Sequence, residues 1–170
     1  LAGGRSRTLS AQFSRSASMT QVNIGERENR RKIIREVVDK LGQEFIDRVK
    51  SAKLILIKPD LVHYELQLAS VHVDTIRGVL DVIRTYSKVP VVIGDAAHFG
   101  TKAGFRNFGY ERLLEHYADV QLVDLQDEPF VEQMFIADNG DQTLLRRPKL
   151  ALEADLTISV SNLKTHKDYG

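Results

Sequence analysis

The chain has 170 residues, of which 42% are hydrophobic, and its 24 Lys and Arg nearly balance 23 Asp and Glu, so one globular domain without a nucleic-acid partner is expected. The absence of cysteine excludes disulfides, zinc–thiolate sites, a cysteine nucleophile and any iron–sulfur cluster held within this chain. No apolar run approaches the ~20 residues of a membrane span, which predicts a soluble, cytoplasmic protein without a membrane partner and leaves its oligomeric state open.

The first residues of the chain form a Ser- and Arg-rich segment that has no acidic residue before Glu26. Such a segment buries too little apolar surface to fold, so we expect a disordered leader over residues 1–25. Its composition fits a transit peptide, and three arginines are too few for a nucleic-acid-binding arm. The favoured interpretation is upstream read-through with Met19 as the true start, which leaves residues 26–170 as the folded domain.

The remaining sequence alternates helical and strand patterns. Apolar residues at helical spacing predict a helix from Glu26 that Gly42 ends, and short continuous apolar runs predict strands buried on both faces. Asp74 is expected to cap the third helix. The further helices are predicted at 43–50, 74–88 and 110–117, the strands at 53–57, 89–93, 120–124 and 156–160, and a turn at Gly140-Asp141. This order predicts an α/β fold: a mostly parallel sheet with helices on both faces.

Polar side chains follow the predicted strands where each one ends. In open α/β sheets ligands bind beyond the carboxyl ends of the strands, so these residues are expected to converge on one edge. Charged loops at strand ends are also common because loops lie at the surface, and a solvated exit loop is the alternative. The strands end in Lys58-Pro59-Asp60, in Gly94-Asp95 followed by His98, in Asp124, and in Lys164-Thr165-His166.

These residue types suit the binding and protonation of a small anion. Lysine can hold a carboxylate or phosphate, and an imidazole exchanges protons near neutral pH. We expect His166, with His98, to transfer a proton, while Asp95 orients an imidazole or a metal. The expected substrate-binding residues are Lys58, Lys164 and Thr165.

Several familiar motifs are absent from the sequence. There is no Gly-x-Gly-x-x-Gly after a strand, no phosphate-binding loop with Gly-Lys-Ser/Thr, no Gly-x-Ser-x-Gly and no His-Glu-x-x-His. Metal-ligand spacing is likewise missing, so no metal site is predicted and the cofactor remains unknown.

Three segments carry a resemblance to a known family. The sequence Ile-Leu-Ile-Lys-Pro-Asp-Leu-Val at 55–62 resembles the opening strand of the uncharacterised family called domain of unknown function three-six-two, with Asp60 where the family usually has Asn. Val-Val-Ile-Gly-Asp at 91–95 is similar to its middle segment. The most specific match is Glu-Ala-Asp at 153–155, a strand, and Lys-Thr-His at 164–166.

The resemblance implies an N-terminal part of a longer fold. The family has no settled activity, its members are sometimes linked to iron–sulfur domains, and it normally continues beyond the Lys-Thr-His segment. We therefore expect a domain truncated at its C-terminus. The layout also resembles the N-terminal domain of nickel-pincer lactate racemase, under which His98 and His166 would form an acid–base pair. Three functions stay open: an enzyme acting on a small anion, a non-catalytic anion-binding or redox-accessory module, and an inactive fragment.

Overall fold

The computed structural model describes residues 22–26 and 29–164 of the chain. Within this part, four parallel strands form one sheet in the order β3-β2-β1-β6, and two antiparallel strands form a separate hairpin, β4–β5. Nearly all of the predicted leader, together with Thr165 and His166, lies outside the described residues. The strands are β1 (Ile55–Pro59), β2 (Val91–Asp95), β3 (Val120–Asp124), β4 (Phe130–Ile136), β5 (Gln142–Pro148) and β6 (Leu156–Val160).

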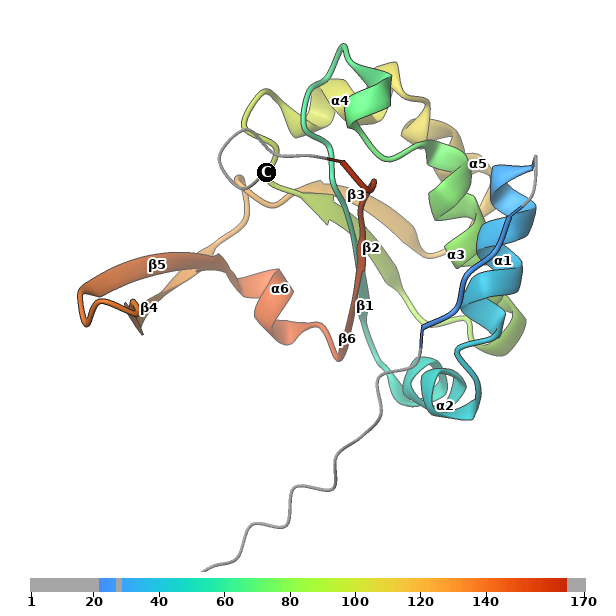
Figure 1. Ribbon diagram of the computed structural model, residues 1–170, viewed down its shortest axis with the longest axis horizontal. Helices are drawn as coiled ribbons and strands as arrows, with labels where there is room; N and C mark the ends of the chain where they lie inside the picture. The colour runs from blue at the N-terminus through green and yellow to red at the C-terminus, as the bar shows by residue number, and fades with distance from the viewer. Residues whose placement is uncertain (1–21, 27–28, 165–170) are drawn as a thin grey trace, which may run out of the picture.

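Helices lie on both sides of the four-stranded sheet, as predicted (Figure 1). α3, α4 and α5 connect β1 to β2 and β2 to β3 on one side, where α1 packs outside α3. The short α6 and the hairpin lie on the other side. The helices are α1 (Arg30–Asp39), α2 (Gln43–Ser51), η1 (Gln67–Ala69), α3 (Val73–Tyr86), α4 (Thr101–Asn107), η2 (Tyr110–Arg112), α5 (Leu113–His116) and α6 (Lys149–Glu153).

The core lies between the sheet and α3. Alternate residues of β1, Ile55 and Ile57, are fully buried toward the helices, while Leu56 between them is 1% exposed on the opposite face. A strand buried on both faces needs a continuous apolar run, and this run is what the sequence showed. The predictions of four strands and a parallel sheet are therefore confirmed.

The strands differ in one functional respect from those predicted: β1 continues through Lys58 and Pro59, and β2 through Asp95. Pro59 is tolerated because it is the last residue of β1, where its missing N–H removes little of the ladder. The following amide, of Asp60, donates to the carbonyl of Val160 on β6. Lys58 and Asp95 therefore sit on the sheet itself rather than in its loops.

Asp155 joins the residues that immediately precede β1 and β6. Its carboxylate accepts hydrogen bonds from the amides of Lys53 (2.8 Å) and Leu54 (3.0 Å), and its own amide donates to the carbonyl of Leu54. These backbone hydrogen bonds, from Lys53 and then Leu54, lower the pKa of Asp155. The Asp of the Glu-Ala-Asp segment thus has a structural role at the amino edge of the sheet.

His72, not Asp74, caps the amino end of α3. The Nδ1 atom of His72 accepts a hydrogen bond from the amide of Asp74 at 3.1 Å, and Asp74 lies in the first turn of the helix. Only an imidazole with unprotonated Nδ1 can accept this bond. Burial, together with the nearby cation of Arg30, lowers the pKa of His72 below its ordinary 6.5.

This cap predicts a pH-dependent stability. Since the unfolded chain binds the His72 proton more tightly, the stabilisation is complete above the ordinary pKa and is lost as the pH falls below 6.5 toward the lower folded value. His72→Asn keeps a favoured cap without a titrating group. We expect urea unfolding to show that the native chain loses stability relative to this variant as the pH falls from about 7.5 to 5.5. If the difference in the free energy of unfolding between the two proteins stayed constant over that range, His72 would not be the cap.

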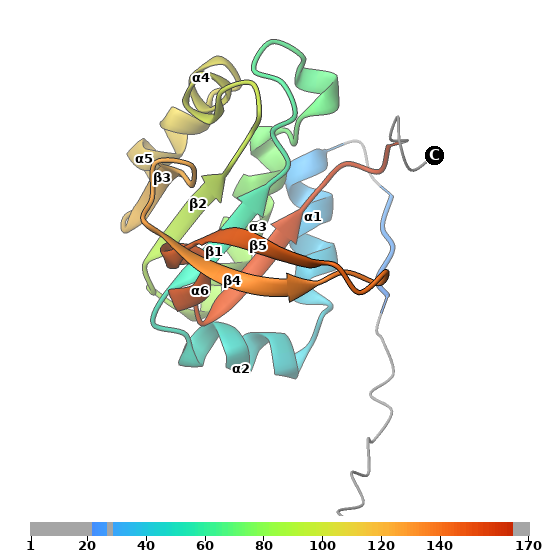
Figure 2. The same ribbon diagram turned by 90° about the vertical axis from the view of Figure 1, so that its left-hand side faces the viewer.

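The β4–β5 hairpin was not predicted as strands, although the turn at Gly140-Asp141 was. Gly140 has φ of 86°, a conformation that favours glycine, and it lies in the turn. The hairpin stands on the α6 side of the sheet (Figures 1 and 2), and its residues are exposed except for the half-buried Pro148. Its large apolar side chains are 42–64% exposed: Phe130, Val131, Met134, Phe135, Ile136, Leu144 and Leu145.

Candidate functional site

The carboxyl ends of β1 and β2 are joined by an ion pair between Lys58 and Asp95. Lys58 Nζ lies 2.8 Å from Asp95 Oδ1, and the amide of Leu61 donates to Asp95 Oδ2 at 2.8 Å. Asp95 is 4% exposed, so a partner for each oxygen is needed to offset the cost of burying its charge. The Lys58 side chain remains 45% exposed, which leaves N–H donors that a ligand can reach.

The loop that follows Asp95 is fixed by Thr101. Its hydroxyl donates to the backbone carbonyl of Asp95 at 3.3 Å and accepts from the amide of Ala97 at 3.0 Å. Thr101 is fully buried at the start of α4. The backbone from Asp95 to Thr101 is therefore held at both ends, and it carries His98 at the surface between them.

A second lysine–carboxylate pair joins the carboxyl ends of β1 and β6. Lys164 Nζ donates to Asp60 Oδ2 at 2.5 Å and to the carbonyl of Ala69 at 3.0 Å. Nearby, the side-chain amide of Asn162 donates to the carbonyl of Ser70 at 3.0 Å. Both predicted lysines thus lie at the expected edge, and each is neutralised by a carboxylate.

His98 belongs to an aromatic group rather than to these ion pairs. Its ring meets Phe99 edge-on with centroids 4.7 Å apart, Phe99 lies 5.2 Å from His63, and His63 stacks on Tyr64 at 5.0 Å. Phe99 is 53% exposed. The predicted acid–base pair of His98 and His166 stays a prediction, as does the role of Thr165, because residues 165–170 lie outside the described part.

A cavity of about 320 Å³ opens at the same edge, between the sheet and the base of the hairpin. Ala96 and Leu125, the first residues after β2 and β3, line one side, and Phe130 and Pro148, which face each other across the hairpin, line the other. The polar lining consists of Gln126, Glu128 and Arg146. Arg146 was not predicted as a site residue, since no motif surrounds it and its strand was not predicted.

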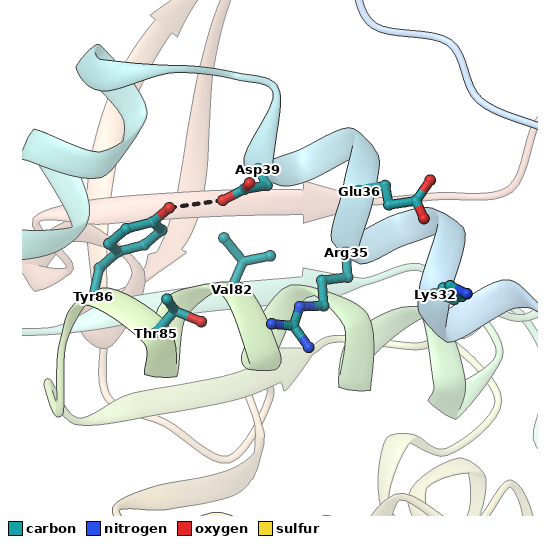
Figure 3. Close-up of a pocket in the computed structure, with 7 residues that line it drawn as sticks. All are labelled: Lys32, Arg35, Glu36, Asp39, Val82, Thr85 and Tyr86. Carbon is teal, nitrogen blue, oxygen red and sulfur yellow. Dashed lines mark hydrogen bonds between the residues drawn. The ribbon is translucent and has the colours of Figure 1, made fainter.

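A different pocket lies between α1 and α3, away from the strand ends (Figure 3). Its volume is about 370 Å³, and the Tyr86 hydroxyl donates to Asp39 across it at 2.7 Å. It is lined by both acidic and basic side chains and contains no predicted site residue. We therefore assign the candidate site to the carboxyl edge of the sheet.

The described residues offer no resident metal site: among them, no three His, Asp or Glu side chains are grouped to hold an ion. In the same part of the chain, no helix is long and apolar enough to cross a membrane.

Comparison with known proteins gives one match. The model of a family described as Domain of unknown function (DUF362) matches residues 55–170, from the first residue of β1 onward. No curated protein and no solved structure matches the chain significantly.

Proposed function

The chain belongs to the DUF362 family, whose model covers more than half of it, and we propose that it binds and acts on a small anionic molecule at the carboxyl edge of its parallel sheet. The family description assigns no activity, so the proposal rests on the site. The observation that carries it is the 320 Å³ cavity that opens directly after β2 and β3 at that edge.

Lys58 does not line the cavity itself, but its position at the same edge of the sheet supports the proposal. It alternates with Leu56 on β1 and therefore starts on the same face of the sheet as Leu56. Leu125, which lines the cavity, lies against Leu56 and Gly94 on that face. With one of its N–H donors on Asp95, the half-exposed Lys58 ammonium has others to offer to an anion.

In the enzymatic form of this proposal, the histidines transfer protons. His98, exposed on the loop after β2, and His166, two residues beyond Lys164, are the acid–base candidates. Ligand binding would then perturb the ring-proton resonances of either imidazole, which an NMR spectrum of the histidine ring protons measures. Substituting His166 with Ala would leave ligand affinity nearly unchanged and abolish turnover.

A second candidate function is a binding module without catalysis. It is favoured by the pairing of both lysines with carboxylates, which builds an electrically neutral edge without using any described histidine. In that case ligand binding leaves the ring-proton resonances of His98 and His166 unchanged. Affinity would be insensitive to His166→Ala and His98→Ala and would fall on Lys58 substitution.

The test is isothermal titration of the chain with inorganic phosphate, succinate and phenylacetate. For each of these anions that binds, Lys58→Met is expected to weaken the affinity about tenfold. Lys58→Arg, which keeps the charge, controls for the loss of the Asp95 partner. Lys102→Met is the matched control, because Lys102 also pairs with a carboxylate, Asp127 at 2.6 Å, but lies on α4 and not at the end of a parallel strand. Equal effects of Lys58→Met and Lys102→Met would contradict the proposal.

A further inference from the structure

We propose that the ligand at this edge is a monocarboxylate with an apolar body, and that Arg146 of the hairpin holds its carboxylate. The inference rests on the proposed function and specifies its substrate class. It follows from three observations: the cavity has apolar walls, the nearby lysines are already paired with carboxylates, and Glu128 lines the same cavity.

The walls of the cavity favour an apolar body. Leu125 is buried against the sheet, with its amide hydrogen-bonded to the carbonyl of Asp95 at 2.8 Å. Opposite it, Phe130 and Pro148 are register partners at the base of the hairpin. Next to this pair, the amide of Lys149 donates to the carbonyl of Pro129 at 2.7 Å and closes the base. A volume of about 320 Å³ suits a ligand of small size.

Among the cations near the cavity, Arg146 is the one best placed to bind an anion. Its guanidinium carbon lies 3.2 Å from the centre of the Phe130 ring, so the planar group is stacked and its orientation is restricted. Glu132 faces it across the hairpin, yet no ion pair of Arg146 is found within the described residues. A stacked guanidinium keeps its N–H edge for two parallel bonds to a carboxylate.

The lysines are poorer anchors for the same carboxylate. Lys58 and Lys164 each have a carboxylate within 2.8 Å, so an incoming anion must compete with Asp95 or Asp60. Arg146 makes no ion pair among the described residues, so an incoming carboxylate displaces no partner there, although Glu132 faces it across the hairpin and Glu128 lines the same cavity. The carboxylate is therefore expected on Arg146, with Lys58 contributing at longer range.

Glu128 lines the same cavity and sets the charge of the ligand. A carboxylate there repels additional negative charge, which disfavours dianions such as phosphate or succinate. A ligand with one carboxylate at Arg146 and an uncharged remainder places the least negative charge near Glu128. This discriminates a carboxylate from a phosphate, although arginine binds either.

The experiment is isothermal titration with phenylacetate, acetate and inorganic phosphate. Phenylacetate is expected to bind about tenfold or more tightly than either of the others. Arg146→Gln should weaken phenylacetate about tenfold, and Arg146→Lys should restore only part of the affinity because the forked donor is lost. Arg147→Gln is the matched control: Arg147 lies on the opposite face of the hairpin, donates to Gln133 at 3.0 Å, and should change affinity less than twofold.

Two results would overturn the inference: equal phenylacetate affinity of Arg146→Gln and the native chain, or phosphate binding as tight as phenylacetate. If phosphate binds and responds to Lys58→Met but not to Arg146→Gln, the proposed function stands and the carboxylate assignment fails. Because Arg146 is exposed on the hairpin, Arg146→Gln should fold, which its circular dichroism spectrum and thermal unfolding check.

Discussion

Replacement of Asp95 by alanine is expected to lower the free energy of unfolding by about 3 kcal/mol, the largest effect of any substitution considered at the edge. The carboxylate is 4% exposed and accepts hydrogen bonds from both Lys58 and the Leu61 amide. Its removal leaves a buried amide without an acceptor and an ammonium without its partner. Because Lys58 is half exposed and can turn to water, the cost stays at the lower end for a buried pair.

Asp124→Ala is the matched control for this substitution. Asp124 is the register partner of Asp95 on β3, but its carboxylate accepts a hydrogen bond only from the nearby Gln126 amide, at 3.1 Å, in the contacts described. Its replacement should cost less than about 1 kcal/mol. Urea unfolding of both variants gives the comparison. Equal losses would mean that the position on the strand, not the Lys58–Asp95 pair, determines the stability of the edge.

The second large effect is expected at Gly78, where α3 and α1 are closest. A methyl group added at Gly78 would lie 2.8 Å from the backbone carbonyl of Arg31 and 2.8 Å from Cβ of Ile34. Neither atom belongs to the far end of a flexible side chain, so α1 must shift. It is held in place by Arg31, whose guanidinium donates two hydrogen bonds to Asp81 on α3. Gly78→Ala should therefore destabilise the fold by about 1–3 kcal/mol.

At Gly104 the same substitution, glycine to alanine, is expected to have the opposite effect on stability. It is also buried in a helix, α4, but an added methyl group would find its nearest neighbour, Leu61, at 3.7 Å, which is ordinary contact. Gly104→Ala should stabilise the chain by up to about 1 kcal/mol, because alanine favours the helix. Thermal unfolding of the two variants tests the sign. A gain at Gly78, or a loss at both positions, would contradict the described helix packing.

The two central strands, β1 and β2, could be predicted because burial on both faces requires a continuous apolar run, whereas β3 and β6 at the edges of the sheet are exposed or half-buried after their first residue. Leu56 and Val92, on the face away from α3, are 1% and 4% exposed, so both β1 and β2 had to be continuously apolar. The hairpin sequence contains no such continuous apolar run. Its strands mix Phe, Met and Leu with Glu, Gln and Arg, and with neither face buried there is no selection for alternation.

The positions of the candidate site residues could be predicted, but their contacts could not. The strand-end rule correctly placed Lys58, Asp95 and Lys164 at one edge. It could not predict that each lysine would be paired, since the pairs depend on strand order: Lys58 meets Asp95 because β2 neighbours β1, and Lys164 meets Asp60 because β6 does. Arg146 was unpredictable because its position follows from the undetected hairpin.

The most direct test of the central claim is a ¹H–¹⁵N NMR titration of the chain with phenylacetate. Binding at the carboxyl edge predicts saturable shifts of the amides that follow β1, β2 and β3, over residues 60–63, 96–101 and 125–130, together with Arg146. These shifts should disappear in Arg146→Gln. Saturable shifts confined to the pocket between α1 and α3 (Figure 3), or no saturable shifts at the carboxyl edge, would contradict the account.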